Sequence, residues 1–157
     1  MDTNDTIQRF ANNYFANSSC SVTDIELENH NRDYCGARFK INNYTVRFRK
    51  AKITPNKVGQ FVVVWQKDRN NVNEAYPYEL SPDFLIVYTE MKLKEGAFIF
   101  PKEALMKNKI LSTDKQKGKM GFRVYPSWDK VESPQALKTQ RWQSKYFVDF
   151  TQKDSTV

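Results

Sequence analysis

The chain has 157 residues, a formal net charge of +7, and 39% hydrophobic and 14% aromatic residues. This length suits one domain with one core, and five glycines without repetitive tracts exclude fibrous and disordered classes of protein. No run of 18 apolar residues is present, which excludes a membrane-spanning helix.

The N-terminal segment predicts one clear helix. Apolar residues recur at helical spacing over 6–16, whereas 17–36 is polar, and a short helix over 23–28 is the one element we expect there. The chain starts with acidic and polar residues, unlike a secretory signal, so we expect a cytoplasmic protein. In that compartment Cys20 and Cys35 are expected to be free thiols, although the sequence also allows one bridge between them.

Residues 37–53 have the pattern of a β-hairpin that turns at Asn42-Asn43. In the second arm, apolar residues alternate with Thr45, Arg47 and Arg49, which predicts one apolar face and one open basic face. The alternation then slips, and a bulge near Arg49-Lys50 would keep the following lysines on the open face.

The rest of the chain predicts short strands and two helices. Unbroken apolar runs are typical of strands that are covered on both faces, and we expect strands over 61–65, 84–88, 97–100 and 122–125. Helices are expected over 102–108 and 134–150, with loops over 68–83 and 115–119. This order predicts an α/β fold, with a central mixed sheet flanked by helices and an added N-terminal hairpin.

A helix, three strands, a helix and a fourth strand is the core order of restriction-endonuclease-like, PD-(D/E)xK nucleases. Their chemistry needs two carboxylates that hold Mg²⁺ and a lysine that positions or activates water. Pro82-Asp83 precedes the 84–88 strand, and Glu90-Met91-Lys92 completes the motif as text. Asp83 and Glu90 are seven residues apart on one strand, roughly 23 Å if extended, so they cannot share one ion.

A better alignment places the second half of the motif on the next strand, as Phe100-Pro101-Lys102. The lysine is retained, but phenylalanine stands where the second carboxylate is required. Asp83, Phe100 and Lys102 are therefore interpreted as degenerate remnants of a nuclease site. The single histidine and two separated cysteines add no four-ligand zinc site. We expect no catalytic residue, no metal and no cofactor.

Four separated segments resemble the MepB family. They are KITPNKVGQFV at 52–62 with Trp65, FIFPK at 98–102, FRVYP at 122–126, and TQRWQ at 139–143 with Tyr146-Phe147. The resemblance covers 37–150 and implies one domain over 1–157, with a helical segment 1–36 and a tail 151–157. It also implies a PD-(D/E)xK-like fold with degenerate catalytic residues and nucleic-acid binding. Gln66 stands where the family tends to have a base, which implies a weaker phosphate contact there.

Positive charge is concentrated in two blocks of the chain. Residues 36–67 contain eight bases and no acid, and residues 91–130 contain ten bases and four acids. If both blocks share one face, this surface favours a polyanion. Bases interleaved with aromatics such as Tyr44, Trp65 and Trp128 favour single-stranded DNA or RNA over duplex. The predicted phosphate contacts are Arg47, Arg49, Lys50, Lys52, Lys57, Lys67, Lys102, Lys119, Arg123 and Arg141.

Two other functions stay open from the sequence. One is a Mg²⁺-dependent nuclease with a rearranged site, in which Asp83 is joined by Glu79, Glu90 or Asp68. The other is a module that binds a protein or a small anion through the basic face and the aromatic-rich C-terminal segment. No P-loop, dinucleotide fingerprint or G-x-S-x-G motif supports another enzyme class.

Overall fold

The computed structural model describes residues 2–16 and 21–151. Its α-helices are α1 (Thr3–Tyr14), α2 (Lys102–Lys107) and α3 (Pro134–Gln143), and its 3₁₀ helices are η1 (Arg32–Tyr34), η2 (Tyr78–Leu80) and η3 (Ser144–Tyr146). Its strands are β1 (Val22–Leu27), β2 (Ala37–Ile41), β3 (Tyr44–Lys50), β4 (Lys52–Ile53), β5 (Gln60–Val63), β6 (Trp65–Lys67), β7 (Asn73–Ala75), β8 (Phe84–Met91), β9 (Lys94–Pro101), β10 (Gly121–Val124) and β11 (Phe147–Asp149).

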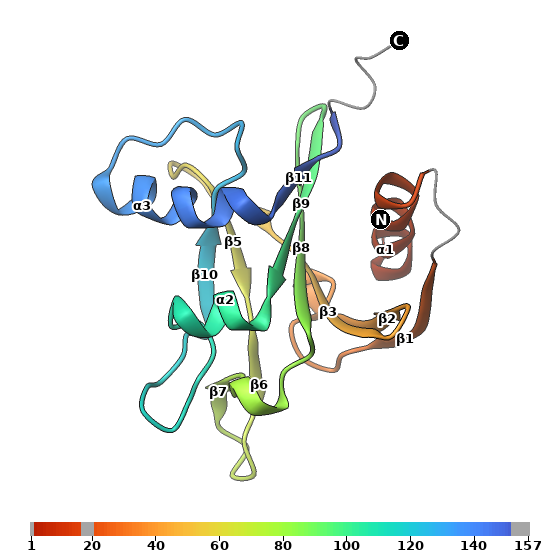
Figure 1. Cartoon of the computed structure of the whole chain (residues 1–157), viewed down its shortest axis with the longest axis vertical. Helices are drawn as coiled ribbons and strands as arrows, with labels where there is room; N and C mark the ends of the chain where they lie inside the picture. Colours follow the sequence, from red (N-terminus) through yellow and green to blue (C-terminus); the bar gives the residue numbers. More distant parts are fainter. Residues whose placement is uncertain (1, 17–20, 152–157) are drawn as a thin grey trace.

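A mixed sheet of six strands organises the fold, in the order β1-β2-β3-β8-β9-β11 (Figure 1). Strands β3 and β8 are parallel, and the other pairs in this sheet are antiparallel. A second sheet has the order β10-β5-β4, and β6 pairs with β7. The predicted mixed α/β architecture, with a central mixed sheet and few helices, is confirmed.

Strands β8 and β9 are covered on both faces, as their apolar runs predict. On one face Ile86 joins Phe10 of α1 and Phe48 of β3 in one buried cluster. On the other face Val87 and Phe100 join a second cluster with residues of α2, β5 and β10. Alternate side chains of β8 thus enter different clusters, because successive residues of a strand point to opposite faces.

The segment predicted as a short helix over 23–28 is instead strand β1, so that prediction is wrong. Strand β1 pairs with β2 at the edge of the sheet, and the register shifts between Thr23 and Glu26. Asp24 has a φ of 55° inside this irregularity. The strand is mostly exposed, so its sequence lacks the alternation that reveals a half-buried strand. The backbone hydrogen bonds of β1 are made with β2, and the sequence of β1 alone does not indicate this pairing.

The helix predicted over 134–150 ends early, at Gln143. Ser133 caps its start by accepting a hydrogen bond from Ala136 N, and Pro134 occupies the first turn. After η3 the chain forms β11, which pairs with β9. A Cβ atom at Gly96 would lie 2.4 Å from Phe147 Cζ, so the missing side chain of Gly96 makes room for β11. This tertiary pairing overrides the helical spacing of the C-terminal aromatics.

The predicted hairpin is present as β2 and β3, with Asn42 at a φ of 55° in its turn. The predicted bulge at Arg49-Lys50 is wrong, because β3 stays in register with β8 through both residues. Cys35 is a free, half-buried thiol, and Cys20 lies outside the described residues. No helix of the described residues is long and apolar enough to cross a membrane.

Candidate functional site

The nuclease-like corner lies where β8 begins and β9 ends. Phe84 pairs with Pro101, and Leu85 pairs with Phe100. Lys102 N donates to Asp83 O at 3.0 Å, so the two residues are direct neighbours. Glu90 lies at the far end of β8, opposite Glu95. The structure therefore pairs Asp83 with the Phe100-Pro101-Lys102 segment, and it separates Asp83 from Glu90 as predicted.

The side chains at this corner serve packing and hydrogen bonding. Asp83 Oδ2 accepts hydrogen bonds from Thr45 N at 2.9 Å and Thr45 Oγ1 at 3.2 Å. Phe100 is fully buried in the core. Lys102 Nζ lies 4.7 Å from the centre of the Tyr78 ring. The cavity here has a volume of about 20 Å³ and no carboxylate in its lining. Asp83 is thus already hydrogen-bonded to β3, and Glu103, the residue after Lys102, accepts a hydrogen bond from the Tyr78 hydroxyl at 3.1 Å.

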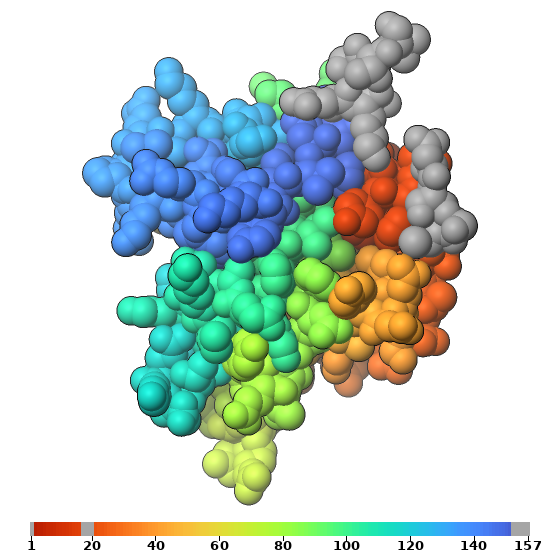
Figure 2. Space-filling view, in the orientation of Figure 1, coloured from red at the N-terminus to blue at the C-terminus, as the bar shows by residue number. Residues whose placement is uncertain are grey.

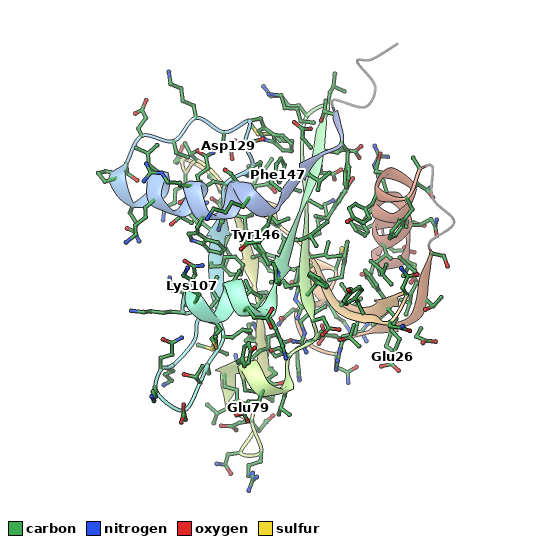
Figure 3. All side chains as sticks on the ribbon, in the orientation of Figure 1. Glu26, Glu79, Lys107, Asp129, Tyr146 and Phe147 are labelled. Carbon is green, nitrogen blue, oxygen red and sulfur yellow. The ribbon has the colours of Figure 1, made fainter. Side chains whose placement is uncertain are left out.

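The other carboxylates considered for a rearranged nuclease site lie elsewhere. Asp68 Oδ1 accepts from Asn70 N at 2.8 Å and from Val72 N at 3.0 Å, which closes the β6–β7 turn. Glu90 pairs with Lys50 at 2.6 Å. Glu79 is exposed in η2, at the lower end of the molecule in Figure 3. Within the described residues no group of three His, Cys, Asp or Glu side chains could hold a metal ion.

Arg49 is a structural residue, and its predicted place on an open basic face is wrong. It is 0% exposed, and its five N–H groups all have acceptors. Nη1 donates to Glu28 Oε1 at 2.7 Å and to the Phe48 carbonyl, and Nη2 donates to Asn31 and to the Tyr76 hydroxyl. Nε donates to Val63 O at 3.1 Å. No donor of Arg49 is left for a phosphate.

Arg47 is also withdrawn from the surface, with 7% exposure. Its Nε lies 3.2 Å from Glu28 Oε1, and its guanidinium lies 3.5 Å from the centre of the Tyr76 ring. Burial lowers the pKa of Arg47, whereas the negative charge of Glu28 opposes that shift. Glu28 follows β1 and is the partner that sequence reasoning missed. The one indication of this role in the sequence is that Glu28 is among the last acids before an acid-free block.

The other predicted cations of the first block are spread over different surfaces. Lys50 is paired with Glu90. Lys52 Nζ lies 4.6 Å from the Tyr34 ring centre, and Lys67 Nζ lies 5.6 Å from that of Trp65. Lys57 is exposed in the loop before β5. Lys57 and Lys67 line different clefts, so the cations of this block do not share one site.

A groove of about 510 Å³ between β10 and α3, here called the β10–α3 groove, gathers cations from β10, from the loop before it and from α3. Figure 2 shows this face hollowed between α3, in blue, and the teal segment that includes 108–119. Its lining contains three bases, three aromatic residues and no acid. They are Lys119, Arg123, Lys138, Phe122, Tyr125 and Trp142. Lys119 and Arg123 were predicted as contacts, and Lys138 was not.

Arg123 connects this groove to the first basic block. Its Nη1 donates to Val58 O at 3.2 Å, and its Nη2 donates to Thr54 Oγ1. The contact exists because β10 pairs with β5, which places Arg123 opposite Phe61. Of the other predicted cations, Arg141 is exposed on α3, and Lys102 lies at the start of α2 outside the groove lining.

Two glutamines of the TQRWQ segment hold the walls of the groove together. Gln143 is fully buried, accepts from Tyr125 N at 2.8 Å and donates to Arg123 O at 2.9 Å. Gln140 Nε2 donates to Pro126 O and Asp129 O. Trp142 both lines the groove and packs on Phe100, with ring centres 5.4 Å apart. The glutamines thus position the groove rather than line it with free amides.

Two proteins of known structure are similar to this chain in fold. A solved structure described as MepB is 39% identical, with a TM-score of 0.82, over 90% of this chain and 95% of that one. The structure of a bacterial homing endonuclease is 16% identical, with a TM-score of 0.52, over 96% of this chain and 92% of that one, and it shows similarity of fold. No curated protein sequence matches the chain. The sequence model of the MepB-like family matches residues 28–149, so the chain belongs to the MepB-like family.

Proposed function

We propose that this protein binds nucleic acid through the β10–α3 groove and does not cleave it. The observation that carries the proposal is a groove with three bases and no acid in its lining, on a fold similar to that of an endonuclease. Lys119, Arg123 and Lys138 would contact phosphates, and Arg141 on the exposed side of α3 would extend the contact. An acid-free groove favours a polyanion because no carboxylate repels the phosphates.

The aromatic lining supports a preference for single strands. Tyr125 and Trp142 are half-buried, so part of each ring faces the groove. Bases of a single strand are free to stack on such rings, whereas bases of a duplex are paired and stacked with one another. The absence of cleavage is proposed because buried Phe100 stands where the nuclease motif requires its second carboxylate, and because Asp83 is already hydrogen-bonded to Thr45.

The test is a fluorescence-anisotropy titration with labelled single-stranded DNA, duplex DNA and RNA between about 50 and about 200 mM salt. The variant is Lys119→Glu with Lys138→Glu. Its control is Arg38→Glu with Lys40→Glu, two exposed residues of β2 with the same change in charge, on the other side of the molecule (Figure 1). We expect the groove variant to bind at least about tenfold more weakly, and its salt slope to fall by about 1.4 to 1.8, the value of two lost phosphate contacts.

Three results would contradict the proposal. Equal losses in the groove variant and the β2 control would mean that net charge alone drives binding. Cleavage with Mg²⁺ or Mn²⁺ that disappears in Asp83→Ala would support the rearranged nuclease instead. A salt-independent interaction with a protein from nuclease-treated lysate would favour the protein-binding alternative.

A further inference from the structure

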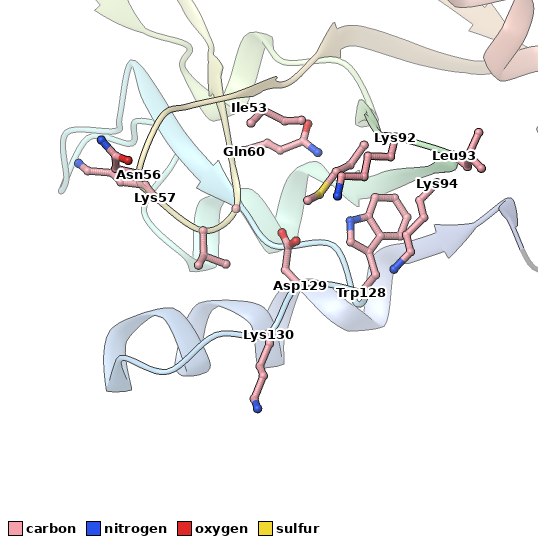
Figure 4. A pocket seen from close by; sticks show the side chains of 13 residues that line it. Ile53, Asn56, Lys57, Gln60, Lys92, Leu93, Lys94, Trp128, Asp129 and Lys130 are labelled. Carbon is pink, nitrogen blue, oxygen red and sulfur yellow. The ribbon is translucent and has the colours of Figure 1, made fainter.

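A second cleft of about 750 Å³ lies away from the nuclease-like corner, here called the lysine-rimmed cleft (Figure 4). Its walls come from residues 56–60, the β8–β9 turn and residues 128–130. The nuclease-like corner is at the opposite end of β8 and β9, so this cleft is no part of it. Four lysines belong to its lining: Lys57, Lys92, Lys94 and Lys130.

Unpartnered polar atoms concentrate at this cleft. Three buried side-chain polar atoms have no hydrogen-bond partner among the described residues, and two of them, Gln60 Oε1 and Trp128 Nε1, belong to cleft residues. Gln60 is 2% exposed, and its Nε2 donates to Glu90 O at 3.3 Å, which leaves the acceptor Oε1 unused. Buried polar groups are nearly always satisfied, so an unused acceptor and an unused donor at one cleft indicate a ligand that brings both.

Asp129 supplies the third polar group and is the one carboxylate of the lining. Figure 4 shows its carboxylate pointing into the cleft, below Gln60 and beside Trp128. It is half-buried, and no described residue forms an ion pair with it within 4.0 Å. Burial raises the pKa of Asp129, and the charge of Lys94 opposes that shift. A desolvated carboxylate favours a ligand with paired N–H donors, because these restore its lost hydration.

We propose that the lysine-rimmed cleft binds a guanine nucleotide, with the base on Asp129 and Trp128 and the phosphate on the lysines. Guanine has two adjacent donors, N1–H and N2–H, on the edge that also carries the acceptor O6. Adenine and cytosine place a ring-nitrogen lone pair beside their single amino group, which an ionised carboxylate repels. Uracil has one N–H between two carbonyls. The apolar part of the lining, which includes Ile53, Val58 and Met91, suits the face of a planar ring.

The nucleotide can be free or can belong to a strand, and the cleft adjoins the β10–α3 groove through one residue. Arg123 lines the groove and donates to the carbonyl of Val58, which lines the cleft. The inference rests on the proposed function only where the guanine belongs to a bound strand. Binding of a free nucleotide tests the cleft separately.

The experiment is isothermal titration calorimetry of the whole protein with GMP, AMP, CMP and UMP. We expect GMP to bind at least about tenfold more tightly than the other three, since a missing donor leaves a charged acceptor unpaired. Asp129→Asn keeps the size of the side chain but removes its charge and replaces one of its two acceptor oxygens with an amide donor. It should weaken GMP binding about 10- to 100-fold, whereas Asp114→Asn, an exposed aspartate in the 113–118 loop, should leave it unchanged. Guanosine should bind more weakly than GMP.

Equal affinity for all four nucleotides, or an unchanged affinity in Asp129→Asn, would overturn the inference. An oligothymidine strand separates it from the proposed function because it contains no guanine. The Asp129→Asn variant should bind this strand like the unmodified protein, and the Lys119→Glu, Lys138→Glu variant should still bind GMP. Salt-dependent strand binding without GMP binding would overturn only the proposed nucleotide site in the cleft. GMP binding without salt-dependent strand binding would overturn only the proposed nucleic-acid site in the groove.

Discussion

Arg49 and Glu28 form an interior ion pair, with Nη1 of Arg49 2.7 Å from Oε1 of Glu28. The pair ties β3 to the segment after β1 and is enclosed by Tyr76 and Asn31. From the sequence, Arg47 and Arg49 were predicted to contact phosphates. In the structure both bind Glu28 and stabilise the fold instead. The variants that test nucleic-acid binding must avoid them, because their loss would affect folding before binding.

The first prediction concerns this ion pair. Glu28→Ala leaves Arg47 and Arg49 without their common counter-charge, and breaking a buried pair from one side costs about 3 to 5 kcal/mol. We expect a loss of that size in the free energy of unfolding, measured by urea denaturation. Glu26→Ala removes an exposed glutamate two residues earlier, and it should change the same quantity by less than about 0.5 kcal/mol. A loss in Glu28→Ala no larger than in this control would show that the arginines do not need Glu28.

The second prediction assigns Asp83 to the fold. Asp83→Ala removes an acceptor from the backbone and hydroxyl groups of Thr45, which join the starts of β3 and β8. We expect the free energy of unfolding to fall by about 1 to 3 kcal/mol. Asp83→Asn retains one acceptor oxygen and should recover part of that loss. Urea denaturation of the three proteins with and without Mg²⁺ is the measurement. Stabilisation by Mg²⁺ that Asp83→Ala abolishes would instead indicate a metal site.

The third prediction separates the two hydrogen bonds of Gln143. Gln143→Glu retains the acceptor for Tyr125 N but replaces the donor to Arg123 O with a second oxygen. A buried carboxylate facing a carbonyl is unfavourable, so we expect a destabilisation above about 1 kcal/mol and weaker strand binding, because β10 and α3 are no longer held together. The control is Gln8→Glu, an exposed position of α1 outside the groove lining, at which the protein should keep its stability and its strand binding. Thermal unfolding and anisotropy titrations measure the two effects.

The fourth prediction is a pH dependence at Glu95, which joins α1 to β9. Burial alone would raise the pKa of Glu95, but hydrogen bonds from Arg9 and Tyr88, together with the charge of Arg9, outweigh it and lower the pKa below the ordinary value of 4.5. A carboxyl whose pKa is lower in the folded state stabilises the protein above its unfolded pKa. That contribution disappears as the pH falls through the folded pKa.

The difference in unfolding free energy between the unmodified protein and Glu95→Gln should therefore be constant near neutral pH and shrink below about pH 4.5. Urea denaturation at a series of pH values measures it. A Glu95→Gln difference that stays constant through the acid range would contradict the assignment.

Several features of this protein follow from the sequence by itself. The pattern of residues 37–53, with alternation in the second arm, predicted the β2–β3 hairpin, and the apolar runs predicted strands covered on both faces. The spacing of Asp83, Phe100 and Lys102 predicted a nuclease-like corner that lacks one carboxylate. Four short segments indicated the MepB-like family. Each of these signals is local. The spacing of apolar residues and the type of residue at a given position of a strand can be read within one short segment of the sequence.

Only the tertiary structure decided which cations are available at the surface. Arg49 and Lys119 are both bases in base-rich segments, yet one is enclosed by Glu28 and Tyr76, and the other lines the β10–α3 groove. The same holds for β1 and β11, whose ladders come from strands distant in the chain. Burial, pairing and strand partners depend on residues that meet only on folding, so a periodic pattern indicates the conformation of a segment but not what lies across from it.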